Sequence, residues 1–232
     1  MKILGIDTAT KFLCIGVYDN GKVSEYNLLL DRQHLALLVP AIKRILQALG
    51  WQPEDLDYLA CGLGPGSFTG SRIGVSAIKG LAWSLQKPAI GVSTLDNIAC
   101  NIAAEGDILV ASDAKRGLVY GCFYRHKNGQ IKRTSDYLLL KPEELAKKAK
   151  PKCLVTADAL DLYRQVFLKG IKRCVLADKD YWQPQGRNII RLALEKIERK
   201  EINNSFDLEP VYLYPQDCQV VTRHKAQGTG HK

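Results

Sequence analysis

Residues 61–83, CGLGPGSFTGSRIGVSAIKGLAW, are the stretch from which the fold of this chain can be worked out. A short apolar segment leads into a glycine-rich turn, and apolar residues at helical spacing follow the turn. Five of the first fourteen residues are glycine. Glycine clusters between a strand and a helix commonly bind phosphate, because backbone amides can approach an anion closely there. The stretch therefore raises the question of whether it binds a nucleotide.

Neither of the common nucleotide-binding fingerprints is present in this stretch. A Walker A loop needs a glycine followed by lysine and a hydroxyl residue, and no glycine of the chain has those neighbours. A dinucleotide loop has the spacing GxGxxG, but after Gly64 and Gly66 the third glycine, Gly70, comes one place late. The glycines are then better explained by a sharp turn and by close packing. Small residues on one helix face let a second helix approach closely, and that helix belongs either to this chain or to another subunit.

The apolar pattern predicts the same order of elements twice. In the first half, strands are expected at 2–7, 12–19, 22–30, 57–63 and 88–92, and helices at 32–49, 69–85 and 93–103. In the second half, strands are expected at 107–114, 118–126, 131–140, 152–157 and 173–177, and helices at 142–149, 159–170 and 185–200. Asn-Gly pairs at 20–21 and 128–129 mark hairpin turns. Each half has the order βββαβαβα.

This order predicts an α/β fold made of tandem duplicated βββαβαβα units, the layout of the actin-like ATPase (ASKHA) superfamily. Short strands joined by helical crossovers need helices on the faces of their sheet. We expect an N-terminal actin-like subdomain over residues 1–105 that carries the partner interface, and a C-terminal actin-like subdomain over residues 106–218. Residues 219–232 are expected to form a disordered basic tail.

The first hairpin of each unit is the candidate nucleotide site, since proteins of this layout bind nucleotide between the two halves. The residues at the two hairpin tips are Asp7, Thr8, Thr10, Asp113, Lys115 and Arg116. Neither tip has the tight glycine turn that lets backbone approach a phosphate. We therefore interpret the six residues as a degraded nucleotide cleft without catalysis. Helix capping or a solvated turn is the alternative role for the two aspartates.

Composition and residue spacing exclude several other classes of site. The net charge of +9 either keeps the protein soluble or attracts an RNA backbone. Seven scattered cysteines without a CxxC pair indicate a reducing, cytoplasmic compartment, and we expect neither a secretory signal nor a membrane span. No histidines have metal-ligand spacing, and His34 is expected to cap a helix or lie on the surface. Ser67 has no identifiable base, so no catalytic residue and no metal site are predicted.

Several motifs together closely resemble the TsaB family, also called YeaZ. They are ILGIDTAT at 3–10, RQHLALLVPAI at 32–42 and GLGPGSFTGSRIGVSAIKGLA at 62–82. The segments STLDNIA, SDAKRGLVYGCFY and EPVYLYPQD extend the resemblance over nearly the whole chain except the tail. Two positions depart from the family pattern, with Tyr214 where arginine is usual and Ser71 where leucine is common.

The resemblance implies a non-catalytic dimerisation and scaffold subunit. TsaB-like proteins are paralogues of TsaD, the subunit that transfers threonylcarbamoyl to tRNA. They pair with TsaD, and the ATPase TsaE engages the pair. Together the subunits would form N6-threonylcarbamoyladenosine next to the anticodon of tRNAs reading codons that begin with A. No cofactor of its own is implied for this chain, because ATP or ADP and metal would be bound by the partner subunits. A homodimer in the absence of TsaD stays open.

The partner contact in the family uses helices of the N-terminal half, which agrees with the small-residue helix predicted above. The expected contact face consists of Leu35, Leu38, Ile42, Ile45, Gly70, Ile73, Gly74, Ala77 and Leu81. If this face is external, Gly74→Leu leaves the monomer folded and abolishes pairing. Two other functions stay open: a stand-alone actin-like ATPase or kinase that binds nucleotide between its halves, and a peptidase, the class to which TsaD relatives were once assigned.

Overall fold

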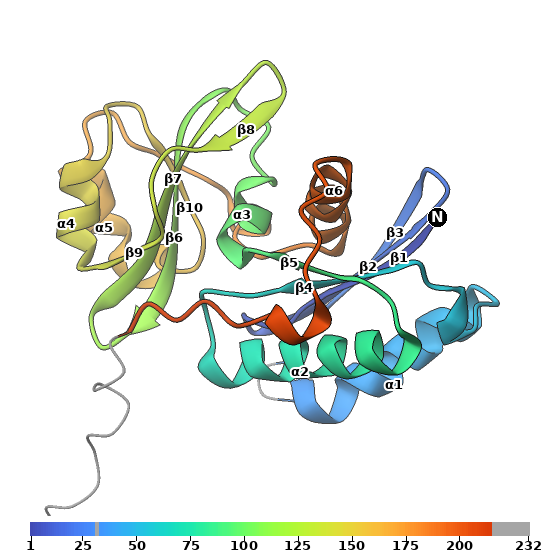
Figure 1. Cartoon of the computed structure of the whole chain (residues 1–232). Coiled ribbons are helices and arrows are strands. Elements are labelled where there is room, and N and C mark those ends of the chain that lie inside the picture. The colour runs from blue at the N-terminus through green and yellow to red at the C-terminus, as the bar shows by residue number, and fades with distance from the viewer. Residues whose placement is uncertain (31–32, 215–232) are drawn as a thin grey trace, which may run out of the picture.

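A computed structural model of the chain describes residues 1–30 and 33–214 (Figure 1), so the tail predicted at 219–232 lies outside the described residues. The first sheet has the strand order β3-β2-β1-β4-β5. Its antiparallel part is β1 (Lys2–Asp7), β2 (Phe12–Asp19) and β3 (Lys22–Leu29). Its parallel part adds β4 (Tyr58–Gly62) and β5 (Ala89–Val92). The helices of this half are α1 (His34–Ala48), α2 (Phe68–Leu85) and α3 (Thr94–Ala99).

The second sheet has the strand order β11-β10-β6-β7-β8, with β9 also paired to β7. Its strands are β6 (Gly106–Lys115), β7 (Leu118–Lys127), β8 (Gln130–Arg133), β9 (Leu138–Leu140), β10 (Leu154–Thr156) and β11 (Val175–Leu176). Its helices are α4 (Pro142–Lys148), α5 (Leu160–Gly170) and α6 (Gly186–Glu198). Three short 3₁₀ turns complete the described chain: η1 (Pro53–Asp55), η2 (Lys179–Tyr181) and η3 (Ser205–Asp207). The predicted α/β fold of two successive units, each built on its own mixed sheet, is confirmed.

One predicted strand is wrong. The segment 131–140 forms two strands, because the chain leaves the sheet between β8 and β9. Arg133 pairs with Tyr124 and Leu138 pairs with Gly121, so four residues stand opposite two of β7. Apolar alternation does not encode such an excursion, which depends on partners elsewhere in the fold.

The two units exchange helices. Helices α1 and α2 cover one face of the first sheet, and α6 covers its other face, although α6 lies near the end of the described chain (Figure 1). Helices α4 and α5 cover one face of the second sheet, and α3, from the first half, packs on the other face. Gly16 of β2 lets α6 approach, since a Cβ there would lie 2.1 Å from the carbonyl oxygen of Gly186. Packing therefore crosses the sequence boundary expected near residue 105.

A partly buried polar cluster joins the two units where α3 meets β7. The carboxylate of Asp96 accepts hydrogen bonds from the phenols of Tyr124, at 2.7 Å, and Tyr137, at 3.0 Å. Tyr137 lies in the segment that leaves the sheet between β8 and β9, which explains that excursion. Burial, and secondarily the Asp96 charge, raises the pKa of the Tyr124 phenol well above its ordinary value. Both tyrosines therefore act as hydrogen-bond donors that hold the exchanged helix α3 on the second sheet.

Candidate functional site

The glycine-rich turn between β4 and α2 packs against the first hairpin. The hydroxyl of Thr8 donates a hydrogen bond to the carbonyl of Gly70 at 2.7 Å, and the backbone N–H of Ser67 donates to the carbonyl of Ala9 at 2.6 Å. A Cβ on Gly66 would lie 2.3 Å from the Ala9 carbonyl oxygen. The side chain of Ser67 caps α2 by accepting from the N–H of Gly70. The turn therefore binds the β1–β2 turn of the same chain.

Gly74, one turn further along α2, makes the same kind of contact. A Cβ on Gly74 would lie 2.4 Å from the hydroxyl oxygen of Thr8. Both Gly70 and Gly74 are buried. The prediction that these two glycines belong to an external contact face is wrong, because the helix side that carries them faces Thr8 in the β1–β2 turn. Sequence spacing identifies a small-residue face, but it does not say which neighbour that face meets.

Asp7, the first residue of the predicted nucleotide cleft, is completely buried. Its carboxylate accepts hydrogen bonds from the N–H of Ala9 at 2.9 Å and from the hydroxyl of Thr94 at 2.8 Å. Burial raises the pKa of Asp7 from 3.8 to about 6, although both hydrogen bonds lower it. Thr8 is equally buried. The prediction that Asp7 and Thr8 face a ligand is therefore wrong, while Thr10 is only partly buried.

The second hairpin tip is at the surface. The backbone turns at Lys115 and Arg116 with φ of 66° and 54°. The Lys115 ammonium pairs with the Asp113 carboxylate, and the N–H of Asp113 donates to Asp158 at 3.0 Å. The phenol of Tyr214 donates to the carbonyl of Ala114 at 2.9 Å. Because Asp7 and Thr8 are buried, the structure does not bring the six predicted residues together as one open site.

An apolar groove lies between α1 and α2. It has a volume of about 530 Å³ and includes four of the predicted contact residues: Leu35, Leu38, Ile73 and Ala77. Leu35 and Val39 of α1 are 76% and 65% exposed, and Phe68 of α2 is 42% exposed. Exposed apolar side chains on neighbouring helices are typical of a surface that another protein covers.

The groove has members that the sequence analysis missed, and some predicted members lie elsewhere. Val39, Phe68, Thr69, Arg72 and Ser76 also line it. The signal for Val39 is its position four residues after Leu35, which gives α1 a second apolar stripe. Ile42 is buried in the core below, and Ile45 and Leu81 are half-buried against the same core. Ile42, Ile45 and Leu81 therefore support the groove from within.

Arg72 closes one end of the groove. Its guanidinium lies 3.6 Å from the centre of the Phe68 ring, and its Nε donates to the phenol of Tyr212 at 2.8 Å. The Phe68 and Tyr212 rings lie 5.5 Å apart. The chain near residue 212 is thereby held against the start of α2.

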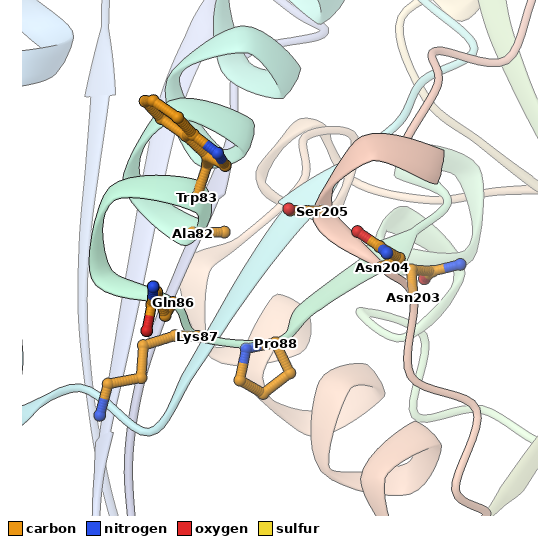
Figure 2. A pocket seen from close by; sticks show the side chains of 8 residues that line it. All are labelled: Ala82, Trp83, Gln86, Lys87, Pro88, Asn203, Asn204 and Ser205. Atoms are coloured by element: carbon orange, nitrogen blue, oxygen red, sulfur yellow. The ribbon is translucent and has the colours of Figure 1, made fainter.

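A second hollow, of about 390 Å³, lies at the other end of α2 beside η3 (Figure 2). Figure 2 shows Trp83 and Asn204 on opposite sides of it, with Lys87 pointing away. Asn203 has a structural role, because its side chain accepts from the N–H of Gly91 and its N–H donates to Ala89. No prediction had been made for these residues.

His34 is 6% exposed, so the prediction that it caps a helix or lies on the surface is wrong. Within residues 1–30 and 33–214, no three His, Cys, Asp or Glu side chains are grouped as a metal site. The six described cysteines are unpaired. No helix in that part of the chain is long and apolar enough to span a membrane.

The family model for TsaD, tRNA N6-adenosine threonylcarbamoyltransferase, matches residues 28–179. The tRNA threonylcarbamoyladenosine biosynthesis protein TsaB of Escherichia coli is 39% identical over 62% of this chain and 64% of its own length, and that of Bacillus subtilis is 38% identical over 57% and 59%. The match thus spans less than two thirds of these two relatives. The TsaB of Buchnera aphidicola from Acyrthosiphon pisum is 30% identical over 92% of this chain and 98% of its own. The solved structure of YeaZ from Pseudomonas aeruginosa covers 91% of this chain and 99% of its own, with a TM-score of 0.81 and 26% identity.

Proposed function

The chain belongs to the TsaB family, and from this premise we propose that it is a non-catalytic subunit in the biosynthesis of tRNA threonylcarbamoyladenosine. In this proposal it pairs with TsaD as a heterodimer, and TsaE engages the pair. The modified adenosine lies next to the anticodon of tRNAs reading codons that begin with A. A second copy of the chain would take the place of TsaD when TsaD is absent.

The groove between α1 and α2 is the observation that carries this proposal. Leu35 and Val39 expose most of their apolar surface to water in the isolated chain. Burying one such side chain contributes about 1.5–3 kcal/mol to association. Helical faces commonly associate when the side-chain ridges of one helix pack into the grooves of its neighbours. A partner's helix could pack into the groove between α1 and α2 in this way.

The first hairpin supports a scaffold role over a phosphotransfer role. For phosphotransfer, a carboxylate at the position of Asp7 would have to contact a nucleotide or its metal ion. The Asp7 carboxylate instead accepts hydrogen bonds from the N–H of Ala9 and the hydroxyl of Thr94 inside the fold. Thr8 likewise binds Gly70. These two residues stabilise the packing of α2, the helix that forms one wall of the groove.

Variants in the groove test the proposal. Leu35→Asp and Val39→Asp, made separately, should each weaken binding to TsaD of the same cell by at least about thirtyfold, since about 2 kcal/mol of apolar burial is lost. The melting temperature of the isolated chain should stay close to wild type because both side chains are exposed. Leu162→Asp is the matched control, as Leu162 is 63% exposed on α5, in the other half. Analytical ultracentrifugation of the mixed proteins measures the affinity.

An omission assay tests the function itself. TsaD, TsaE, threonylcarbamoyl-adenylate, ATP and unmodified tRNA are incubated with and without this chain, and modified adenosine is quantified after digestion to nucleosides. We expect modification to require the chain and to fail with Leu35→Asp. Equal modification without the chain would contradict the proposed function. Unchanged affinity of both groove variants for TsaD would contradict the proposed contact alone.

A further inference from the structure

Three loops of the second unit carry an unusual concentration of positive charge. Residues 127–132, 147–152 and 169–173 contain nine Lys or Arg and no Asp or Glu, in a chain whose net charge is +9. All nine basic side chains are exposed. We call these three loops the basic edge.

Sheet register brings the three loops to one end of the second sheet. At that end Gly106 of β6 pairs with His126 of β7, so the β7–β8 turn lies beside the start of β6. Leu154 of β10 pairs with Ile108 of β6 and with Val175 of β11. The loops that follow α4 and α5 therefore enter the sheet at the same end, which is uppermost in Figure 1.

The two loops after α4 and α5 are joined directly. The N–H of Lys152 donates to the carbonyl of Lys172 at 2.8 Å. Strands lie about 4.8 Å apart, so the loops at β11, β10 and β7 spread over roughly 15 Å. A nucleic-acid duplex presents several phosphates over such a width, at one charge per about 1.7 Å of its axis.

Most of this charge is not accounted for by the fold. Lys147, Lys148 and Lys169 lie in the last turns of α4 and α5, where a cation stabilises the helix end. Lys150, Lys152, Lys172 and Arg173 lie beyond the helix ends, and Lys127 and Lys132 lie in β7 and β8 beside their turn. Among the described residues, Lys150 is the only one of the nine in an ion pair, with Asp107 at 3.6 Å, and that carboxylate also binds Arg125 at 2.8 Å. The other acid bordering the basic edge is Glu105, whose carboxylate accepts from the N–H of Asn128.

We propose that the basic edge binds the phosphate backbone of RNA. This inference rests on the proposed function, which places the chain in an assembly that acts on tRNA. Lysines that neutralise phosphates release counterions, so the contact is electrostatic, independent of base sequence and weakened by salt. Helix α6 borders this surface, because the guanidinium of Arg191 donates to the carbonyl of Gly129 in the β7–β8 turn at 3.5 Å. The helix packs on the first sheet, and its Arg191 and Arg199 also pair with Glu195.

A charge-matched pair of triple variants tests the basic edge. The first is Lys148→Gln, Lys169→Gln and Lys172→Gln, and the control is Lys11→Gln, Lys22→Gln and Lys43→Gln, exposed lysines of the first unit. Binding of the full chain to unmodified tRNA is measured by fluorescence anisotropy over a range of salt concentrations. The first variant should lose about tenfold or more in affinity, and its salt slope should fall by about two, while the control stays near wild type.

Several outcomes would overturn the inference. Equal loss in both triple variants would mean that net charge alone matters, and no loss in the first would place any RNA contact elsewhere. Binding of the wild type to phosphatidylserine vesicles together with no binding to tRNA would assign the surface to a membrane. The omission assay separates the two proposals. If modification requires the chain, and the first variant both binds tRNA with wild-type affinity and fully restores modification, the basic edge is refuted while the proposed function stands.

Discussion

Gly74 and Gly80 lie on the same helix, and the structure predicts opposite effects when each is replaced by alanine. A Cβ on Gly74 would lie 2.4 Å from the hydroxyl oxygen of Thr8, whereas a Cβ on Gly80 would have no atom within 4 Å. Both glycines are inside α2, so alanine improves intrinsic helix propensity equally at the two positions. Only tertiary contact distinguishes them.

The magnitudes follow from that contact. Forcing a methyl group into a filled space costs about 1–3 kcal/mol. If Thr8 rotates away, its 2.7 Å hydrogen bond to the Gly70 carbonyl is lost, at a cost of about 1 kcal/mol. Against these terms, the gain in helix propensity is up to about 1 kcal/mol. Gly74→Ala should therefore destabilise the chain by about 1–3 kcal/mol, and Gly80→Ala should stabilise it by up to about 1 kcal/mol.

Urea unfolding followed by circular dichroism measures both free energies, and a thermal scan gives the melting temperatures. At about 2–4 °C per kcal/mol for a chain of this size, the two variants should differ by roughly 2–16 °C. The double variant Thr8→Ala with Gly74→Ala should be less destabilised than the sum of the single changes, because the clash is removed. Equal stability of Gly74→Ala and Gly80→Ala would refute the packing argument. The earlier expectation for Gly74→Leu changes accordingly, since a larger side chain there disrupts the monomer before it can report on pairing.

Two further predictions concern carboxylates that accept hydrogen bonds within the fold, those of Asp7 and Asp96. The pKa of Asp7 is raised to about 6 in the folded chain, so the native state holds a proton that the unfolded state has released, and stability should fall by about 2 kcal/mol as pH rises from 4 to 6. Asp7→Asn should remove this part of the pH dependence; urea unfolding at both ends of the range measures it, and an unchanged difference between the two pH values would contradict the assignment. Asp96→Ala leaves the phenol of the buried Tyr124 without its acceptor and should destabilise the chain by about 1–3 kcal/mol, whereas Tyr124→Phe should cost less, because Asp96 keeps the bond from Tyr137. Calorimetry of both variants tests this order, and a larger cost for Tyr124→Phe would contradict it.

Most helices and strands were predicted correctly because the spacing of apolar residues within each one is a local property of the sequence. Alternation, helical spacing and the two Asn-Gly turns depend on neighbouring residues, and the order βββαβαβα followed from them. The split between β8 and β9 could not be predicted in this way. It depends on Tyr137 reaching Asp96, which is 41 residues away in the chain.

The candidate groove was predicted only in part for the same reason. Apolar spacing on α1 identifies Leu35 and Leu38 alike, yet Leu35 is 76% exposed and Leu38 is 1% exposed. Which stripe faces the core depends on where α1 sits over the first sheet. Phe68 and Arg72 were missed because their role depends on Tyr212, a contact that spans 140 residues between Arg72 and Tyr212.

By itself the sequence determined the α/β class, the duplicated order of elements and the absence of the common nucleotide fingerprints, since all three can be recognised in short stretches. Only the tertiary structure decided what the glycines of α2 contact, that Asp7 and Thr8 are closed to ligands, and that α3 and α6 are exchanged between the two sheets. It also decided that three separate lysine-rich loops form one edge. Burial of a side chain and the proximity of two segments arise from contacts between residues far apart in the chain. Local sequence patterns do not specify which distant surface a side chain will contact.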